Sequence, residues 1–181
     1  MTRATIISDA SFDHRASVAA WAGWVRADGR SARMFSAPIK RKLATSTHAE
    51  ICAIANTLAA ANAAGLIDDG MEVMLQSDCT VALGWVLKLV PGVTERRHAD
   101  SVAVTKVRKQ KGMIGIPAEA AAIIAKIAKA RGLIITVRHV RGHKAGDGRQ
   151  YVNRLVDKAA RKHVRTERAK PKINPVSTTE S

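Results

Sequence analysis

Four acidic residues are candidates for a shared chemical site because of where they fall in the chain. Asp9 and Asp78 each follow an apolar run that is typical of a buried strand. Glu50 lies one turn into an alanine-rich helical stretch, and Asp157 lies inside a late helical stretch. Carboxylates at the ends of neighbouring strands and on adjacent helices can converge on one point. Because converging carboxylates repel each other unless cations lie between them, the pattern predicts a site for hard divalent ions such as Mg²⁺.

The rest of the chain carries the opposite charge. It has 30 Lys and Arg residues against 15 Asp and Glu residues, which gives a net charge of +15. A basic surface binds polyphosphates through direct phosphate contacts and the release of counterions. An acidic cluster inside such a surface indicates a protein that binds nucleic acid and cuts it. Any one of these acids alone is typical of a surface or capping residue, so the prediction depends on their joint placement.

Length and composition indicate one domain in a reducing compartment. A chain of 181 residues with 46% hydrophobic residues can bury a sizeable core. Cys52 and Cys79 are too few for a disulfide framework, so we expect two buried free thiols in the cytoplasm. We also expect the protein to be a monomer. No signal peptide is visible, and the most apolar stretch, Ala118–Ala130, is too short and too charged to span a membrane.

Hydrophobic patterns and turn signals predict an alternation of strands and helices. Five strands are expected at about 4–9, 17–27, 31–37, 71–77 and 133–140. Helices are expected at about 47–64, 79–89, 118–131 and 150–166, and the tail at 167–181 is expected to be disordered. The segment 94–115 is ambiguous and could hold a helix flanked by loops. The order predicts an α/β fold, with a mixed five-stranded sheet whose first three strands are antiparallel and whose later strands are parallel.

Glu50 has a second interpretation that concerns the start of its helix. Ser46 or Thr47 can cap this helix, and Glu50 follows Thr47 by three residues, as in a capping box. Glu50 also lies four residues before Ile54, on the side of the helix that faces the core. That position at the rim of the buried face favours a site role.

Five motifs in this order resemble those of ribonuclease H of the type 1 class, over about residues 4–166. They are Ser8-Asp9-Ala10-Ser11, Thr45-Ser46-Thr47-His48-Ala49-Glu50, Gln76-Ser77-Asp78, Val140-Arg141-Gly142-His143 and Asn153-Arg154-Leu155-Val156-Asp157-Lys158-Ala159-Ala160. Two departures are visible. Ala10 stands where the family usually has Gly, and Ser46, Thr47 and His48 stand where it often has an Asn pair and Arg. The acids are intact, so the departures concern how the nucleic-acid backbone is held.

The resemblance implies roles for the acids. Asp9 would bridge two Mg²⁺ ions, with Mn²⁺ as an alternative metal. Glu50 and Asp78 would complete one metal site and Asp157 the other, and Glu50 would also contact the 2′-hydroxyl that distinguishes RNA from DNA. Asp147 is a rival fourth ligand, and Asp157 is preferred because its surroundings match the helix motif.

Other residues receive weaker assignments. Spacing alone favours an exposed loop residue at His143, whereas the resemblance implies a mobile histidine that assists proton transfer or product release. His139 is expected to be structural and Trp85 to lie in the core. Thr45 matches a family position that contacts a DNA phosphate. A basic segment is either a solvated face or a grip on the substrate, through Arg96, Arg97, Lys106, Arg108 and Lys109.

The expected function is a metal-dependent endonuclease that hydrolyses the RNA strand of RNA–DNA hybrids. One alternative is a nuclease of the same superfamily that acts on branched DNA. Another, from a different class, is a non-catalytic module that binds nucleic acid. The intact set of acids argues against that module, because a pure binder gains nothing from four carboxylates that face phosphate.

Overall fold

The computed structural model describes residues 1–97, 102–107, 115–141 and 149–170. Its strands are β1 (Arg3–Asp13), β2 (Val18–Ala27), β3 (Arg33–Pro38), β4 (Glu72–Ser77), β5 (Thr94–Glu95) and β6 (Ile134–His139). Its helices are α1 (Ser46–Ala63), α2 (Thr80–Leu89), α3 (Ile116–Arg131) and α4 (Arg149–Ala169). Among these described residues, no helix combines the length and the apolar character that a membrane crossing requires.

The strands form one mixed sheet in the order β3-β2-β1-β4-β6-β5. Strands β1, β2 and β3 are antiparallel, whereas β4 pairs parallel with β1 and β6 pairs parallel with β4. This arrangement confirms the predicted α/β fold with three antiparallel strands followed by parallel ones. The predicted number of five strands is wrong, because Thr94 and Glu95 add a sixth strand beside β6. A two-residue strand at a sheet edge is too short to leave a periodic pattern in the sequence.

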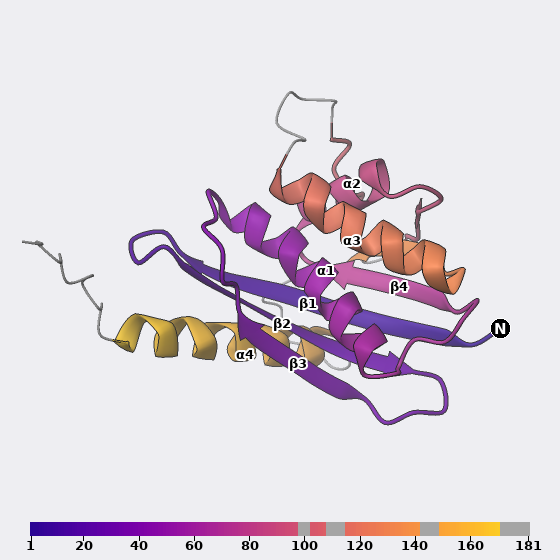
Figure 1. Cartoon of the computed structure of the whole chain (residues 1–181), viewed down its shortest axis with the longest axis horizontal. Coiled ribbons are helices and arrows are strands. Elements are labelled where there is room, and N and C mark those ends of the chain that lie inside the picture. Colours follow the sequence, from indigo (N-terminus) through magenta and orange to yellow (C-terminus); the bar gives the residue numbers. More distant parts are fainter. Residues whose placement is uncertain (98–101, 108–114, 142–148, 171–181) are drawn as a thin grey trace, which may run out of the picture.

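Helices cover both faces of the sheet (Figure 1). Helix α1 packs on β1 and β2 with α2 and α3 beside it, and α4 lies on the other face against the antiparallel strands. The larger core lies under α1, where Ile51, Ile54 and Leu58 are fully buried. The smaller core holds α4 through Val156 and Ala160, which pack against Ile7 of β1 and Ala22 of β2. Each face of the sheet is therefore held to its helix by a core of its own.

A glycine sets how closely α1 approaches the sheet. Gly23 of β2 faces Thr57, and a Cβ atom added at Gly23 would lie 2.1 Å from the Thr57 hydroxyl oxygen. Thr57 is fully buried and donates its hydroxyl hydrogen to the carbonyl of Ala53, 2.7 Å away. Because atoms cannot approach so closely, no residue larger than glycine fits here without moving the helix.

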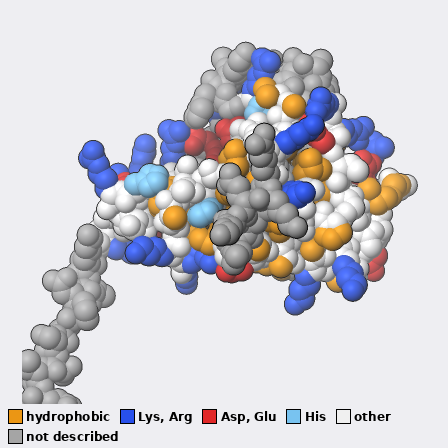
Figure 2. Space-filling model, turned by 90° about the horizontal axis from the view of Figure 1, so that it is seen from above, with side chains coloured by type: hydrophobic (Ala, Val, Ile, Leu, Met, Phe, Trp, Pro, Cys, Tyr) orange, Lys and Arg blue, Asp and Glu red, His pale blue; other side chains and the backbone are white. Residues whose placement is uncertain are grey.

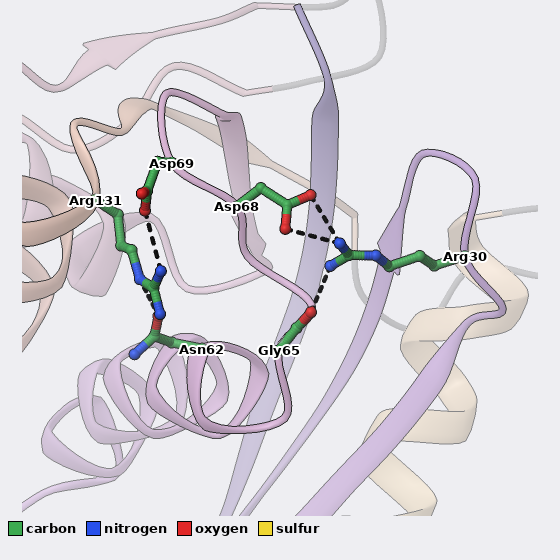
Figure 3. Close-up of polar contacts among 6 residues, drawn as sticks. All are labelled: Arg30, Asn62, Gly65, Asp68, Asp69 and Arg131. Carbon is green, nitrogen blue, oxygen red and sulfur yellow. Dashed lines mark hydrogen bonds and ion pairs between the residues drawn. The ribbon is translucent and has the colours of Figure 1, made fainter.

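Two arginines tie the loop between α1 and β4 to its neighbours (Figure 3). Arg30, in the turn between β2 and β3, donates to both carboxylate oxygens of Asp68 at 2.7 and 2.8 Å and to the Gly65 carbonyl. Arg131, the last residue of α3, donates to Asn62 and Asp69, each at 3.0 Å. These contacts hold the loop that leads into β4, and hence the strand that carries Asp78 at its other end.

Helix α4 extends further than the sequence predicts. Helix α4 ends at Ala169, so residues 167–169, expected in the tail, continue the helix. They do so because Glu167 is half-buried and Arg168 pairs with Asp13 at 3.1 Å, so the last turn has tertiary support. Lys170 follows the helix and pairs with Glu167 at 2.6 Å, and residues 171–181 of the predicted tail lie outside the described residues. In the ambiguous segment, residues 96–97 and 102–107 have no regular secondary structure.

Candidate active site

Asp9 lies just beyond the point where the parallel pairing of β1 with β4 ends. The parallel pairing of β1 with β4 ends at Ile7 and Gln76, whereas the antiparallel pairing with β2 continues to Asp13. Asp9 is therefore in the middle of β1, and the prediction that it ends its strand is wrong. Continued pairing with β2 carries the strand past the point where its apolar run stops. The departure of β4 leaves space beside Asp9 for other acids.

Asp78 occupies the short link between β4 and α2. Ser77 ends β4, and its hydroxyl accepts a hydrogen bond from the Cys79 N–H at 3.1 Å. The Ser77 carbonyl accepts from the Val140 N–H at 3.0 Å, so the end of β4 is held on both sides. These bonds place Asp78 at the carboxyl edge of the parallel strands, as predicted.

Glu50 is held by the start of α1. The residue that caps this helix is Thr45, whose hydroxyl accepts a hydrogen bond from the His48 N–H at 3.2 Å. The prediction of a cap at Ser46 or Thr47 is therefore wrong, and with it the capping box that would have engaged Glu50. Capping by Thr45 moves the helix start, so Glu50 is the fifth helical residue and is free to face the sheet.

Three carboxylates converge in the structure. Oxygen atoms of Asp9, Glu50 and Asp78 all lie within 4.8 Å of one another. Asp9 is only 6% exposed, and its Oδ1 accepts a hydrogen bond from the Ala10 N–H at 2.8 Å. Oε2 of Glu50 is buried and has no hydrogen-bond partner among the described residues. A buried carboxylate oxygen without a partner is costly, and a bound cation would satisfy it.

The electrostatics of this cluster favour a cation. Burial, together with the nearby charges of Asp78 and Asp157, raises the pKa of Asp9 from 3.8 to about 7. Burial and the neighbouring Asp9 and Asp78 likewise raise the pKa of Glu50 well above its ordinary value. Two carboxyl groups that are costly to ionise, with the oxygen of Asp78 beside them, fit a hard divalent ion, whose charge would restore ionisation of Asp9 and Glu50.

Asp157 faces the cluster from α4 but is not one of the three converging residues. Its charge contributes to the raised pKa of Asp9. Its carboxylate forms an ion pair with Arg161, one helical turn later, at 2.7 Å. Arg161 was not predicted as part of the site. The four-residue spacing of opposite charges in a helical stretch was the signal that could have revealed it.

The described residues test other site predictions only in part. His143, Asp147, Arg108 and Lys109 lie outside the described residues, so the choice between Asp157 and Asp147 stays a prediction. His139 is half-buried and its Nδ1 accepts a hydrogen bond from the Val102 N–H at 3.2 Å, which fits a structural role.

Trp85 and Cys52 agree with their predicted surroundings, whereas the predicted burial of Cys79 is only partial. Trp85 is half-buried and packs against the larger core. Cys52 and Cys79 are both free, and Cys52 is buried whereas Cys79 is half-buried.

The described part of the basic segment is partly neutralised by acids. Arg96 pairs with Glu72 at 3.1 Å and Arg97 pairs with Glu95 at 3.3 Å. Glu72 begins β4 whereas Asp78 follows its last residue, so the Arg96 guanidinium group lies about 20 Å along the strand from the cluster. Lys106 is exposed. Of these three residues, Lys106 is the most available to a ligand.

Comparison with known proteins places the chain beside ribonucleases H. The family model for RNase H matches residues 1–165. No curated protein matches the chain in sequence. RNase H1 from the halophilic archaeon Halobacterium salinarum NRC-1 superposes with a TM-score of 0.60 at 14% identity, covering 91% of this chain and 98% of the other.

Two more solved structures have similar folds. The N-terminal RNase H domain of Rv2228c from Mycobacterium tuberculosis superposes with a TM-score of 0.59 at 14% identity, over 92% of this chain and 96% of the other. LC11-RNase H1, which comes from a compost metagenome and was solved with an RNA/DNA hybrid, gives 0.58 at 18% identity, over 92% and 99%. At these identities the structural likeness establishes the fold.

Proposed function

Because this chain belongs to the RNase H family and is therefore a ribonuclease H enzyme, we propose that it hydrolyses the RNA strand of RNA–DNA hybrids by a two-metal mechanism. The observation that carries the proposal is the convergence of Asp9, Glu50 and Asp78, where a buried oxygen of Glu50 has no hydrogen-bond partner in the described part of the chain. Asp157 joins them as the fourth ligand. The ions are Mg²⁺, with Mn²⁺ as an alternative, and the protein works as a cytoplasmic monomer.

Divalent cations at such a cluster lower the pKa of water and stabilise charge on the attacking and leaving oxygens of a phosphodiester. The chain itself contributes the positions of the acids. Asp9 is held by β1 on one side and by the Ala10 N–H on its carboxylate, so its orientation is set before ligands bind. Glu50 is held by a helix whose capped start fixes its height above the sheet.

Residues around the cluster would engage the hybrid. We assign recognition of the 2′-hydroxyl to Glu50 and proton transfer or product release to His143. Thr45 and Lys106 would contact phosphates, and the hydroxyl of Thr45 can still donate its hydrogen while it accepts from His48. The solved complex of LC11-RNase H1 with an RNA/DNA hybrid supports a hybrid as the substrate.

A panel of substrates tests the proposal. Labelled hybrid, double-stranded RNA, double-stranded DNA and junction DNA are each incubated with Mg²⁺, Mn²⁺ or EDTA. Cleavage of the RNA strand of the hybrid, dependent on divalent metal, is the expected result. Cleavage of junction DNA instead would support the related nuclease, and binding without cleavage of any substrate would support a non-catalytic module.

Substitution tests the metal site within the same assay. Asp78→Asn is expected to abolish cleavage because an amide is a poor substitute for a carboxylate beneath divalent cations. Asp69→Asn, in the loop before β4, is the matched control. The Asp69 side chain is 77% exposed, and within the described residues its ion pair is with Arg131 alone. Full activity of Asp78→Asn with a normal circular-dichroism spectrum would contradict the assignment.

A further inference from the structure

A basic cavity lies beside the carboxylate cluster, between α4 and the turn that joins β1 to β2. We call it the hairpin cleft. Its volume is about 440 Å³, and four guanidinium groups and one carboxylate line it. These charged residues are Arg15 and Asp13 from the hairpin and Arg161, Arg165 and Arg168 from α4. Four positive charges and one negative charge give the lining a net charge of +3.

The single acid in the hairpin cleft is already engaged by the protein. One carboxylate oxygen of Asp13 accepts hydrogen bonds from the N–H groups of Arg15 and Ala16 at 2.9 and 3.0 Å. Its other oxygen pairs with Arg168 at 3.1 Å. The bond from Ala16, together with the neighbouring Arg168, lowers the pKa of Asp13. Asp13 therefore holds the turn and Arg168 in place and leaves the positive charges of Arg15 and Arg165 largely uncompensated.

Two of the arginines are available to a ligand. Arg15 and Arg165 are exposed and form no ion pair with any residue that the structure describes. Arg161 differs, because it pairs with Asp157 and so stands between the hairpin cleft and the carboxylate cluster. Figure 2 shows Lys and Arg side chains above and below the narrow end of the molecule that extends to the left.

The hairpin cleft lies further along the strand that carries Asp9. Asp9 and Asp13 lie four residues apart on β1, and side chains at even spacing point to the same face of a strand. That face is covered by α4, because Ile7, two residues before Asp9, packs against Val156 and Ala160, and Arg168 pairs with Asp13. The separation along the strand is about 13 Å. One nucleic-acid strand has a phosphate for roughly every 3.4 Å of helix axis, so this distance corresponds to about four phosphates.

We propose that the hairpin cleft binds phosphates of the nucleic-acid strand that extends from the cleavage site along β1 and α4, through Arg15 and Arg165. This inference rests on the proposed function, since it places the cleavage site at the carboxylate cluster. Guanidinium groups match phosphate oxygens in geometry as well as charge, and two of them on opposite walls can engage successive phosphates.

The chemistry of α4 favours a nucleic acid over a membrane surface. A helix that lies on a membrane inserts an apolar face into the lipid. Tyr151 and Leu155 are exposed near the start of α4, but the apolar face nearer the hairpin cleft is occupied, because Val156, Ala160 and Val164 are buried. What remains exposed near the hairpin cleft is charge, which suits a solvated polyanion that the two walls can hold.

The experiment measures binding without cleavage. Full-length protein in EDTA is titrated with a fluorescent RNA–DNA hybrid at several salt concentrations between about 50 and 200 mM. The variant Arg15→Gln with Arg165→Gln removes two positive charges. Loss of two phosphate contacts is expected to reduce the log–log salt slope by about 2 and the affinity at 0.1 M salt roughly 50-fold.

A matched variant separates contact from general electrostatics. Lys126→Gln with Lys129→Gln removes the same charge from exposed positions in the second half of α3, away from the end of the sheet that carries the cluster. Its slope and affinity are expected to stay close to wild type. Equal losses in both variants, or no loss in the Arg15 and Arg165 variant, would overturn the proposal.

One further arm completes the test. Vesicles that contain phosphatidylserine report membrane binding, and loss of vesicle binding with hybrid binding intact would refute the nucleic-acid assignment. Because no step requires cleavage, the result is independent of the proposed activity. If the wild-type protein cleaves no hybrid but the Arg15 and Arg165 variant still shows the expected change in salt slope, the proposed function is refuted and the assignment of the hairpin cleft stands.

Discussion

Replacing Asp9 by Asn should stabilise the protein when divalent metal is absent. Burial and the charges of Asp78 and Asp157 raise the pKa of Asp9 from 3.8 to about 7. A carboxyl group whose pKa is higher in the folded state destabilises that state when it ionises. At pH 8 the side chain is ionised both folded and unfolded, so the folded protein bears the full cost. Asn keeps an oxygen for the Ala10 N–H and carries no charge.

The magnitude follows from the shift in pKa. Each tenfold change in proton affinity corresponds to about 1.4 kcal/mol, so a rise from 3.8 to about 7 corresponds to roughly 4 kcal/mol at pH 8. The cost is absent below about pH 4, grows as the pH rises, and is constant above about pH 7. The advantage of Asp9→Asn over wild type should therefore follow the same pH dependence.

Urea unfolding in EDTA, followed by circular dichroism between about pH 4 and pH 8, measures this difference. Asp69→Asn is the control, and its free energy of unfolding should stay within about 1 kcal/mol of wild type at every pH because its carboxylate is exposed. Added Mg²⁺ should stabilise wild type and reduce the advantage of Asp9→Asn. If Asp9→Asn is no more stable than wild type at pH 8 in EDTA, or if its advantage does not shrink on acidification, the electrostatic account of the cluster is wrong.

Other predictions concern packing and proton transfer. Gly23→Ala should lower the free energy of unfolding by about 1–3 kcal/mol in a urea titration, because its Cβ would collide with Thr57. An unchanged midpoint would show that α1 can shift freely. His143→Ala should slow hybrid cleavage about 10²–10⁴-fold and remove one limb of the rate–pH profile, while binding changes little. Wild-type turnover would make it an ordinary loop residue. Asp157→Asn should damage cleavage far more than Asp147→Asn, and the reverse order in the same assay would move the fourth ligand to Asp147.

Much of the fold could be predicted because local signals agree with tertiary structure. Gly132 ends α3 in the left-handed conformation with φ of 60°, and Pro117 stands at its start, as the sequence indicated. The apolar runs before Asp9 and Asp78 became parallel strands that pair up to Ile7 and Gln76. Such features depend on residues a few positions apart, and this is the range over which a sequence pattern carries information.

The sequence by itself determined the identity of the acids, their order along the chain and the elements that carry them. Tertiary structure alone decided that Asp9 lies in mid-strand, since pairing with β2 continues after β4 departs. It also decided that Asp13 meets Arg168 across the hairpin cleft. The convergence of three carboxylates within 4.8 Å depends on how α1 packs on the sheet, through Gly23 and Thr57. Contacts between residues far apart in sequence leave no periodic trace, because they are set by the packing of whole elements.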